Sequence, residues 1–244
     1  MTQGAYSVIN DQVPARWPIG TLMDRLSPEE RTELLTLAPP SPKQAGEPLI
    51  YQGDRDRSEV YLLRSVPGQR HTACVKVTAY LESGGAAMLG IRVSGDVVGE
   101  LAALRRVPRS AMVTTCSPML VHAIRAQAFT DFLDRHPAAW NALARMIADR
   151  LDWANRRRTD FAQFSVPVRV ANVLVEISGR HGVDRADGKR DLGVDLTHEE
   201  IANLVGARKD AVFKAIRRFK DLELIDPGHR RKLVIDPIGL AKFR

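Results

Sequence analysis

The segment that most constrains this chain is 196–222, because it has the pattern of two short amphipathic helices joined by a tight turn. Thr197 is followed three residues later by Glu200, the spacing of a capping box that begins a helix. Gly206 separates the two apolar patterns and suits a turn. The spacing therefore predicts two consecutive helices between these residues.

The second of these helices is apolar on one side and mostly cationic on the other. Its apolar positions are Val212, Ile216 and Phe219. Its opposite side carries Asp210, Lys214 and Arg217, with Phe213 and Arg218 on the flanks. A helix that buries one side and offers cations on the other meets the requirement for a recognition helix in the DNA major groove. The alternative is a solvated helical hairpin with surface lysines.

The charge of the chain also favours a polyanionic partner. Its formal net charge is +7 and its pI is near 9.7, which suits nucleic acid or an anionic membrane surface. Much of the positive charge is clustered in three runs: Arg156–Arg158, then Lys209, Lys214, Arg217, Arg218 and Lys220, then Arg230–Lys232.

Several classes of protein are disfavoured by what the sequence lacks. The two cysteines, Cys74 and Cys116, form neither a metal-ligand pair by spacing nor a disulfide framework, which fits a reducing cytoplasm. No signal pattern and no run of about 18 apolar residues occur, so we expect a cytoplasmic protein without a membrane span. No nucleophile–base pair, metal-ligand spacing or P-loop occurs, so we expect neither an enzyme nor a metal site.

The first half of the chain reads as a β domain. Residues 1–19 have little periodicity and are expected to form a flexible arm. A short helix over 27–37 has Ser27 as its N-cap and Glu30 at the capping-box position. Between 49 and 125 lie six short β-type runs separated by turn residues, which predicts a barrel, sandwich or roll.

A helical stretch follows at 128–162 and carries a narrow apolar seam. Its heptad positions are Trp140, Ala144, Ile147, Leu151, Ala154, Arg158 and Phe161. A narrow seam on an otherwise charged helix favours pairing with a second copy, although Arg158 is a flaw in it. A stripe buried within one globule is the alternative.

The remainder fits a winged helix-turn-helix. Ser165 and Pro167 mark the start of an amphipathic helix over 166–179. Residues 180–195 have room for short strands, and the two-helix unit follows. A β-hairpin with its turn at 227–230 then forms the expected wing.

A candidate phosphate site lies at 95–113. Backbone N–H groups of Glu100, Leu101 and Ala102 would gather at the start of a short helix after Gly99, where an anion is favoured. Arg109 offers a bidentate fork and Ser110 a hydroxyl donor. Glu100 beside a phosphate suits a ligand that also has a hydroxyl, such as a cyclic nucleotide. A helix start with an ordinary salt bridge is the alternative.

The order of these parts resembles the cyclic-AMP receptor/fumarate-nitrate regulator (Crp/Fnr) family of bacterial transcription factors. The resemblance covers about residues 20–240. It rests on Tyr51-Gln52-Gly53-Asp54, Gly99-Glu100-Leu101 with Arg109-Ser110-Ala111, the long helix, the segment 166–171, and Leu196-Thr197 with Glu200-Ile201-Ala202 and Val205-Gly206. It implies an α+β chain with a cyclic-nucleotide-binding β-roll (20–135), a dimerisation helix (136–164) and a winged helix-turn-helix DNA-binding domain (165–244).

The resemblance also implies a ligand and partners. Cyclic AMP or cyclic GMP would be the effector, held by Gly99, Glu100, Arg109 and Ser110. The pair that commonly reads the purine falls at Ala154 and Asn155, of which only Asn155 can hydrogen-bond a base. The partners would be a second copy of the chain, a palindromic DNA operator and, as a further candidate, RNA polymerase.

The DNA-binding residues expected from the pattern and the resemblance are Thr197, Arg208, Lys209, Asp210, Phe213, Lys214, Arg217 and Arg218. The Ser that usually caps the family's recognition helix is replaced by Arg208. Asp210 can accept from a cytosine amino group, and the lysines can reach guanine or phosphate. We therefore expect an operator that differs from the usual family consensus.

Two other functions stay open at this point. The first keeps DNA binding with another effector or none. A haem on His71 or Cys74, in an unusually long loop at 64–73, is one such effector, whereas an iron–sulfur cluster would need more than two cysteines. The second is a cyclic-nucleotide module that controls a protein partner, which the helix-turn-helix disfavours.

Overall fold

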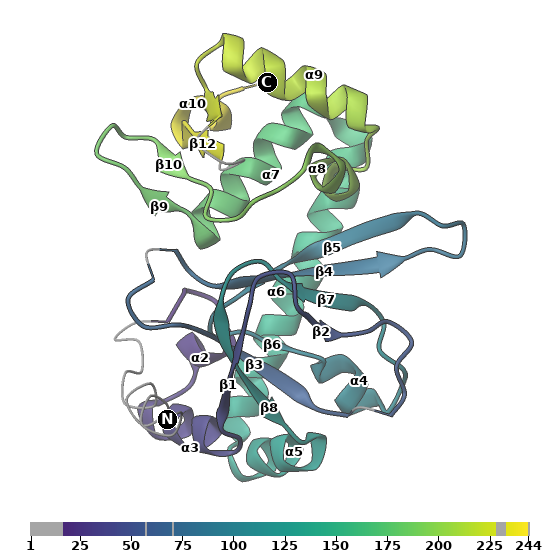
Figure 1. The fold of residues 1–244 in the computed structure, drawn as a ribbon, viewed down its shortest axis with the longest axis vertical. Helices are drawn as coiled ribbons and strands as arrows, with labels where there is room; N and C mark the ends of the chain where they lie inside the picture. The colour runs from purple at the N-terminus through teal and green to yellow at the C-terminus, as the bar shows by residue number, and fades with distance from the viewer. Residues whose placement is uncertain (1–16, 57, 70, 228–232, 244) are drawn as a thin grey trace. The chain divides into compact units, whose positions relative to one another are not determined.

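The computed structural model describes residues 17–56, 58–69, 71–227 and 233–243, which form two compact units (Figure 1). The first unit comprises residues up to 80 together with 91–149, and the second comprises 81–90 together with 150 onward. Residues 1–16 of the expected arm lie outside the described residues. Trp17 is only 3% exposed, so the arm expected over 1–19 does not extend to this residue.

Two antiparallel four-stranded sheets form the roll, and all of it except the β4–β5 tip belongs to the first unit. One sheet has the order β1-β8-β3-β6, formed by Pro40–Lys43, Met119–Ile124, Val60–Ser65 and Val97–Val98. The other has the order β2-β7-β4-β5, formed by Pro48–Ile50, Met112–Thr115, Cys74–Tyr80 and Ala86–Val93. The predicted β-roll is therefore confirmed.

Strand β3 is apolar on both faces because it lies between two cores. Val60 and Leu62 belong to the cluster shared with the helices. Tyr61 and Leu63 belong to the cluster shared with the second sheet. The period of two along a strand sends alternate residues to opposite faces, which explains why this strand reads as a continuous apolar run.

Among the described residues, four short helices accompany the roll. They are α2 (Leu22–Arg25), α3 (Pro28–Thr36), α4 (Glu100–Arg105) and α5 (Ala126–Arg135). The predicted capping box of α3 is present: the Ser27 hydroxyl accepts from the Glu30 N–H at 3.2 Å, and the Ser27 N–H donates to the Glu30 carboxylate at 2.8 Å.

Strand β1 was not predicted, because it lies in a proline-rich segment. Pro40 and Pro42 both lie in this strand. Among the described strands it pairs with β8 alone, at the end of the order, so it is an edge strand. An edge strand tolerates residues that cannot donate to the ladder, which a central strand does not.

The prediction of one helical stretch over 128–162 is wrong, because the structure divides it in two. Helix α5 ends at Arg135, and α6 (Pro137–Gln163) begins two residues later. His136 has φ −124° and ψ 82°. A residue before proline is disfavoured in the helical region, which explains the break at this point.

The buried stripe of α6 is not the predicted heptad seam. It consists of Ala139, Ala142, Leu143 and Met146. Most seam positions are exposed instead; Leu151 is 60% exposed and Phe161 is 61% exposed. The face of α6 that is buried within the chain is therefore not the seam, and most seam residues stay exposed for contact with a partner.

The second unit contains α7 (Val166–His181), α8 (His198–Val205), α9 (Lys209–Asp221) and α10 (Pro237–Ala241). Its sheet has the order β11-β12-β10-β9, formed by Ile225–Pro227, Leu233–Ile235, Arg190–Asp191 and Val183–Asp184. Helix α7 packs against α8, α9 and α10. Ser165 occupies the N-cap of α7 as the predicted start of this helix requires, although its hydroxyl makes no cap hydrogen bond. The predicted wing turn lies mostly outside the described residues.

Candidate nucleotide cassette and DNA-binding surface

The predicted phosphate site, Gly99–Ala102 with Arg109 and Ser110, here called the cassette, is assembled around the guanidinium of Arg109. This residue is only 3% exposed, and its Nη1 donates to the carbonyl of Gly99 at 2.9 Å. Its Nη2 donates to the carbonyl of Glu59 at 2.6 Å. Gly99 is the N-cap of α4, so the guanidinium lies at the start of this helix. The arginine and the Gly-Glu pair that the sequence linked are therefore in contact.

One position in the cassette and one beside it favour glycine because their φ angles are positive. Gly99 has φ +85°, and a Cβ there would collide with Nη1 of Arg109. Gly53 has φ +82° and lies in a turn, and its own N–H donates to the Arg109 carbonyl at 2.8 Å. The Arg109 N–H in turn donates to the Asp54 carbonyl at 3.0 Å. Two separate motifs that carried the resemblance therefore meet at the backbone of Arg109.

The other predicted cassette residues differ in burial. Glu100 is 4% exposed, whereas Leu101 is 43% exposed. Ala102 is half-buried on α4, and Ser110 is exposed beside Arg109. Asn155 is exposed on the part of α6 that belongs to the second unit, and its carbonyl accepts from the Thr159 hydroxyl at 3.0 Å. The roles of all these residues stay predictions.

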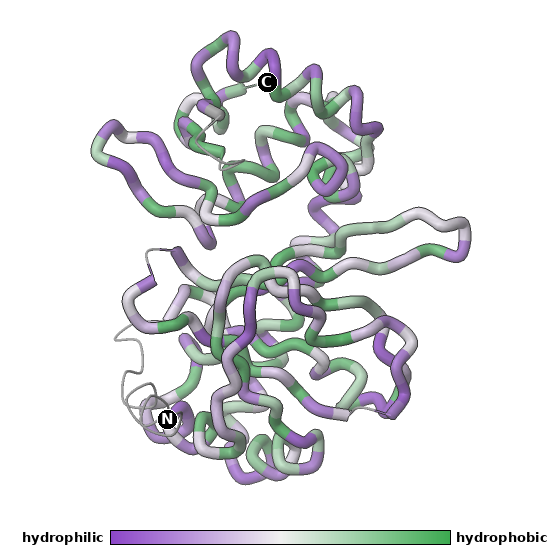
Figure 2. The backbone as a smooth tube through the Cα atoms, in the orientation of Figure 1, coloured by the Kyte–Doolittle hydropathy of each residue, from purple (hydrophilic) through white to green (hydrophobic). Residues whose placement is uncertain are grey.

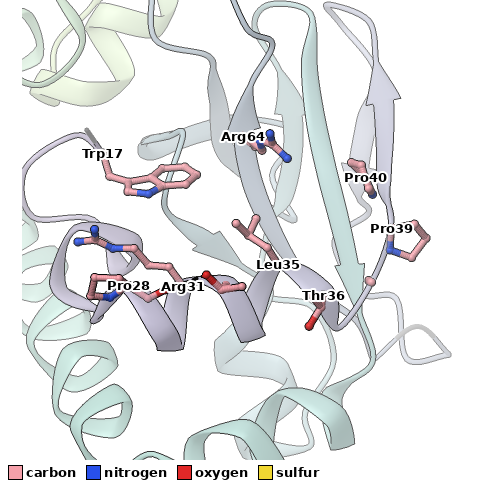
Figure 3. Close-up of a pocket in the computed structure, with 10 residues that line it drawn as sticks. Trp17, Pro28, Arg31, Leu35, Thr36, Pro39, Pro40 and Arg64 are labelled. Atoms are coloured by element: carbon pink, nitrogen blue, oxygen red, sulfur yellow. Dashed lines mark hydrogen bonds between the residues drawn. The ribbon is translucent and has the colours of Figure 1, made fainter. Parts of the chain in front are cut away.

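A cavity of about 620 Å³ opens elsewhere in the first unit, beside α3, β1 and β3 (Figure 3). In this view the Trp17 ring and the Arg64 guanidinium extend above α3, which supplies Leu35 and Arg31. Burial lowers the pKa of Arg64. A second cavity, of about 530 Å³, lies between α4, α5 and the loop that follows β2, and Ala102 lines it. Among the described residues that line these two cavities, Ala102 alone belongs to the predicted cassette.

The helix-turn-helix is built as predicted. The Thr197 hydroxyl accepts from the Glu200 N–H at 3.1 Å, and the Thr197 N–H donates to the Glu200 carboxylate at 2.8 Å. Gly206 has φ +60° and ends α8 in the left-handed conformation. Residues with a side chain rarely adopt this backbone conformation, so glycine suits the turn.

Sequence reasoning assigned no role to Arg169, which holds this turn. It is 8% exposed, and its Nη1 donates to the carbonyls of Val205 at 2.7 Å and Gly206 at 3.3 Å. Its guanidinium also lies 4.8 Å from the centre of the Phe161 ring. Burial lowers the pKa of Arg169, and nearby Asp160 opposes this shift. A cation at the last carbonyls of a helix is electrostatically favourable, so Arg169 stabilises the end of α8.

Helix α9 presents the predicted cationic face. Val212, Ile216 and Phe219 are buried, and Figure 2 shows hydrophobic and hydrophilic residues alternating along this helix. The residues exposed on its other side include Lys209, Asp210, Phe213, Lys214 and Arg217. Arg208 is the N-cap and makes no side-chain cap hydrogen bond. Within the described part of the chain, neither lysine nor Arg217 forms an ion pair.

Not every basic residue predicted from the sequence is equally available. The Arg218 guanidinium lies 5.0 Å from the centre of the Phe243 ring, which directs it toward its own domain. In the run Arg156–Arg158, Arg157 contacts the Glu176 carboxylate at 2.9 Å and Arg156 contacts it at 3.3 Å. Glu176 thus offsets one of the three positive charges of that run, whereas the cations of α9 form no ion pair among the described residues.

Two further expectations concern metals and membranes. Among the described residues, no group of three or more His, Cys, Asp or Glu side chains is arranged to hold a metal ion. Cys74 begins β4 and is 1% exposed. None of the helices in the described ranges is both long and apolar enough to cross a membrane.

Comparison with known proteins agrees with both halves of the chain. Residues 42–136 match the model of the cyclic nucleotide-binding domain, and residues 168–243 match the Crp-like helix-turn-helix domain. The CRP-like cAMP-activated global transcriptional regulator of Mycobacterium tuberculosis is 29% identical over 193 residues, covering 78% of this chain and 86% of the relative. The cAMP-activated regulator CRP of Pasteurella multocida is 24% identical over 77% of this chain and 85% of the relative.

Solved structures show the same fold. The c-di-GMP-responsive global regulator of Xanthomonas campestris superposes with a TM-score of 0.70 at 16% identity, covering 86% of this chain and 99% of the other. A regulator of the Crp/Fnr family from Thermus thermophilus superposes with a TM-score of 0.66 at 23% identity, covering 83% and 96%. The two matched domains follow each other along the chain in the order of the roll and the helix-turn-helix. The chain therefore belongs to the Crp/Fnr family of DNA-binding transcription regulators.

Proposed function

We propose that this protein is a cytoplasmic homodimeric regulator whose affinity for DNA is set by cyclic AMP or cyclic GMP bound at the cassette. The observation that carries the proposal is the buried guanidinium of Arg109 at the start of α4, inside a region that matches a cyclic nucleotide-binding domain. The relatives named above are described as cAMP-activated.

The chemistry of the cassette suits a cyclic phosphate. A guanidinium has five N–H donors, of which Arg109 gives two to backbone carbonyls, so the others can serve phosphate oxygens. Glu100 would accept from the ribose 2′-hydroxyl. Ser110 is exposed beside the arginine and would add a donor. The phosphate would thus be bound by a cationic donor, Arg109, and the ribose hydroxyl by a neighbouring anionic acceptor, Glu100.

Calorimetric titration with cyclic AMP and cyclic GMP tests the cassette. We expect saturable binding by the wild type and a loss of about 100-fold or more in Arg109→Lys, on the order of 3 kcal/mol, because lysine cannot reproduce the fork. Arg105→Ala is the matched control, since Arg105 is an exposed arginine on the same helix. Absence of binding to wild-type protein would contradict the proposed effector and leave a DNA-binding regulator with another effector or none.

The proposed dimer rests on the exposed seam of α6. Leu151 and Phe161 are both largely exposed, and a seam of this spacing pairs two helices. Sedimentation of the wild type should give twice the mass of one chain, and Leu151→Glu should shift the equilibrium toward monomer. Arg145→Glu, at an exposed position off the seam, is the control. A wild type that sediments as a monomer at micromolar concentration would contradict the dimer.

The operator and the effect of nucleotide are tested together. Selection from random duplexes should yield a palindromic site, and binding to it should tighten or weaken when nucleotide is added. Lys209→Ala combined with Lys214→Ala should weaken binding by 100-fold or more, since each good base or phosphate contact contributes about 1–3 kcal/mol. Lys242→Ala, an exposed lysine beside α10, is the control and should change little. An identical affinity with and without nucleotide would contradict the control by effector.

A further inference from the structure

Phe213 is an apolar side chain on the cationic face of α9. It is 52% exposed, although the other aromatic residue of this helix, Phe219, is fully buried. A single exposed apolar side chain is common on protein surfaces, so its exposure alone indicates nothing. Its position is what distinguishes it, because DNA is expected to meet the helix on this face.

The spacing puts Phe213 in one row with two cations. Lys209, Phe213 and Arg217 are four residues apart, so they follow each other along one side of the helix. Phe213 is the fifth residue of α9, about 6 Å along the axis from Lys209. The first turns of a recognition helix are those that contact base edges, so Phe213 is within the reading part of this helix.

His198 braces the ring of Phe213. It is the first residue of α8, and the two ring centres lie 5.5 Å apart with the planes at 72°, an edge-to-face contact. Desolvation lowers the pKa of His198, and Lys220 and Lys209 lower it further. The aromatic contact therefore joins both helices of the motif and limits the directions that the Phe213 side chain can take.

A phenyl ring can read only one feature of the major groove. It has no hydrogen-bond donor or acceptor for base edges, and among the four bases thymine alone presents an apolar group there, its 5-methyl. We propose that Phe213 is a specificity-determining residue that contacts a thymine methyl in the operator, and that His198 positions its ring. The inference rests on DNA binding by α9 and names one base that this helix selects.

The test removes the methyl group and nothing else. In a duplex chosen by selection, each thymine is replaced in turn by uracil, and the dissociation constant is measured at fixed salt. Wild-type protein should bind about fourfold more weakly when one critical thymine is replaced. This corresponds to about 0.8 kcal/mol, the transfer free energy of one buried methyl-sized group. Replacement in both half-sites of a palindrome should weaken binding about fifteenfold.

Variants then assign the effect to the ring. Phe213→Ala should bind thymine and uracil duplexes equally, and Leu222→Ala, a comparably exposed apolar residue at the end of α9, should discriminate like the wild type. His198→Ala should reduce the discrimination while leaving the salt dependence of binding unchanged, because it only positions the ring. Thermal unfolding confirms that the variants are folded.

Two results would overturn the inference. One is a wild type that tolerates uracil at every position, and the other is a uracil effect that persists undiminished in Phe213→Ala. Failure of the wild type to select any duplex is a different outcome, because it would refute sequence-specific DNA binding itself. Loss of nucleotide binding in calorimetry would leave the inference intact, since the uracil series can be measured on whatever DNA-binding state exists.

Discussion

Each of the two compact units has a buried arginine that donates to backbone carbonyls at one end of a helix, and the two ends are opposite. In the first unit, Arg109 contacts the carbonyl of Gly99 at the start of α4. In the second, Arg169 contacts the carbonyls of Val205 and Gly206 at the end of α8. A helix carries partial positive charge at its N-terminus and partial negative charge at its C-terminus. The C-terminus of α8 therefore complements the positive charge of Arg169, whereas the N-terminus of α4 does not complement that of Arg109.

This difference separates a structural arginine from a binding one. Arg169 completes a helix end that would otherwise bury its carbonyls without a strong donor. Arg109 adds positive charge where α4 already presents N–H groups, an arrangement that gains stability from an anion. The same residue type, at similar burial, is thus expected to respond differently to a ligand.

The largest effect that tests this comparison is the loss of each arginine. Arg169→Ala should lower the free energy of unfolding of the second unit by about 2–4 kcal/mol, because it leaves buried carbonyls without their donor. Arg180→Ala, which removes a more exposed arginine of α7, should cost less than about 1 kcal/mol. Calorimetric unfolding measures both, with the two units treated as separate transitions.

Nucleotide provides the second arm of that experiment. At 100 times its dissociation constant, cyclic nucleotide should stabilise the wild type and Arg169→Ala alike, by about 2.7 kcal/mol. Arg109→Ala should be destabilised and should gain nothing from nucleotide. If nucleotide stabilised Arg109→Ala as much as the wild type, the distinction between a binding and a structural arginine would be lost.

The glycines beside the two arginines test the same comparison, with effects of equal or smaller size. Gly99→Ala should cost about 2–4 kcal/mol, because φ is positive and the new Cβ would collide with the Arg109 guanidinium. At Gly206→Ala the nearest atom to the new Cβ is a Phe161 ring carbon at 3.1 Å, and Nη1 of Arg169 is 3.8 Å away, so we expect about 1–2 kcal/mol. Denaturant unfolding compares the two.

Gly188→Ala isolates the backbone contribution, since Gly188 has φ +77° with no atom within 4 Å of the added Cβ. It should cost about 1 kcal/mol. Equal losses in all three variants would show that the close approach of Arg109 to Gly99 contributes nothing to the requirement for glycine.

Much of the second unit could be predicted because its signals are local. The capping box of Thr197 and Glu200 and the glycine turn at Gly206 depend on residues only a few positions apart. The amphipathic pattern of α9 likewise places its own buried and exposed sides. Such short-range rules operate without knowledge of the rest of the fold.

What could not be predicted depends on residues distant in the chain. The contact from Arg169 to Val205 spans 36 residues, and that from Arg109 to Glu59 spans 50. Strand β1 contains prolines, which cannot donate to a ladder, and it forms only as an edge strand paired with the distant β8. The break after α5, by contrast, follows a local rule and was predictable, since Pro137 disfavours a helical residue before it.

The smallest effect concerns pH, and it again compares the two units. His122 in β8 is fully buried, with Nδ1 2.8 Å from the Ala38 carbonyl. Burial lowers its pKa, the hydrogen bond to Ala38 opposes this, and Arg64 lowers the pKa further. The pKa of His198 in the second unit is also lowered, first by desolvation and then by Lys220 and Lys209.

Both histidines therefore bind protons more weakly in the folded chain than in the unfolded chain, where the pKa is about 6.5. Their contribution to stability is present above that pH and is lost as the pH falls below it, by at most about 1.4 kcal/mol per pH unit for each group. Unfolding measured from pH 7.5 to 5 should be less acid-sensitive in His122→Gln than in the wild type, and His198→Gln should reduce the sensitivity less, because His198 is only partly buried. Stability that increased on acidification in the wild type would contradict neutral, buried imidazoles, and an equal effect of the two substitutions would remove the difference expected between the core of the roll and the surface of the helix-turn-helix.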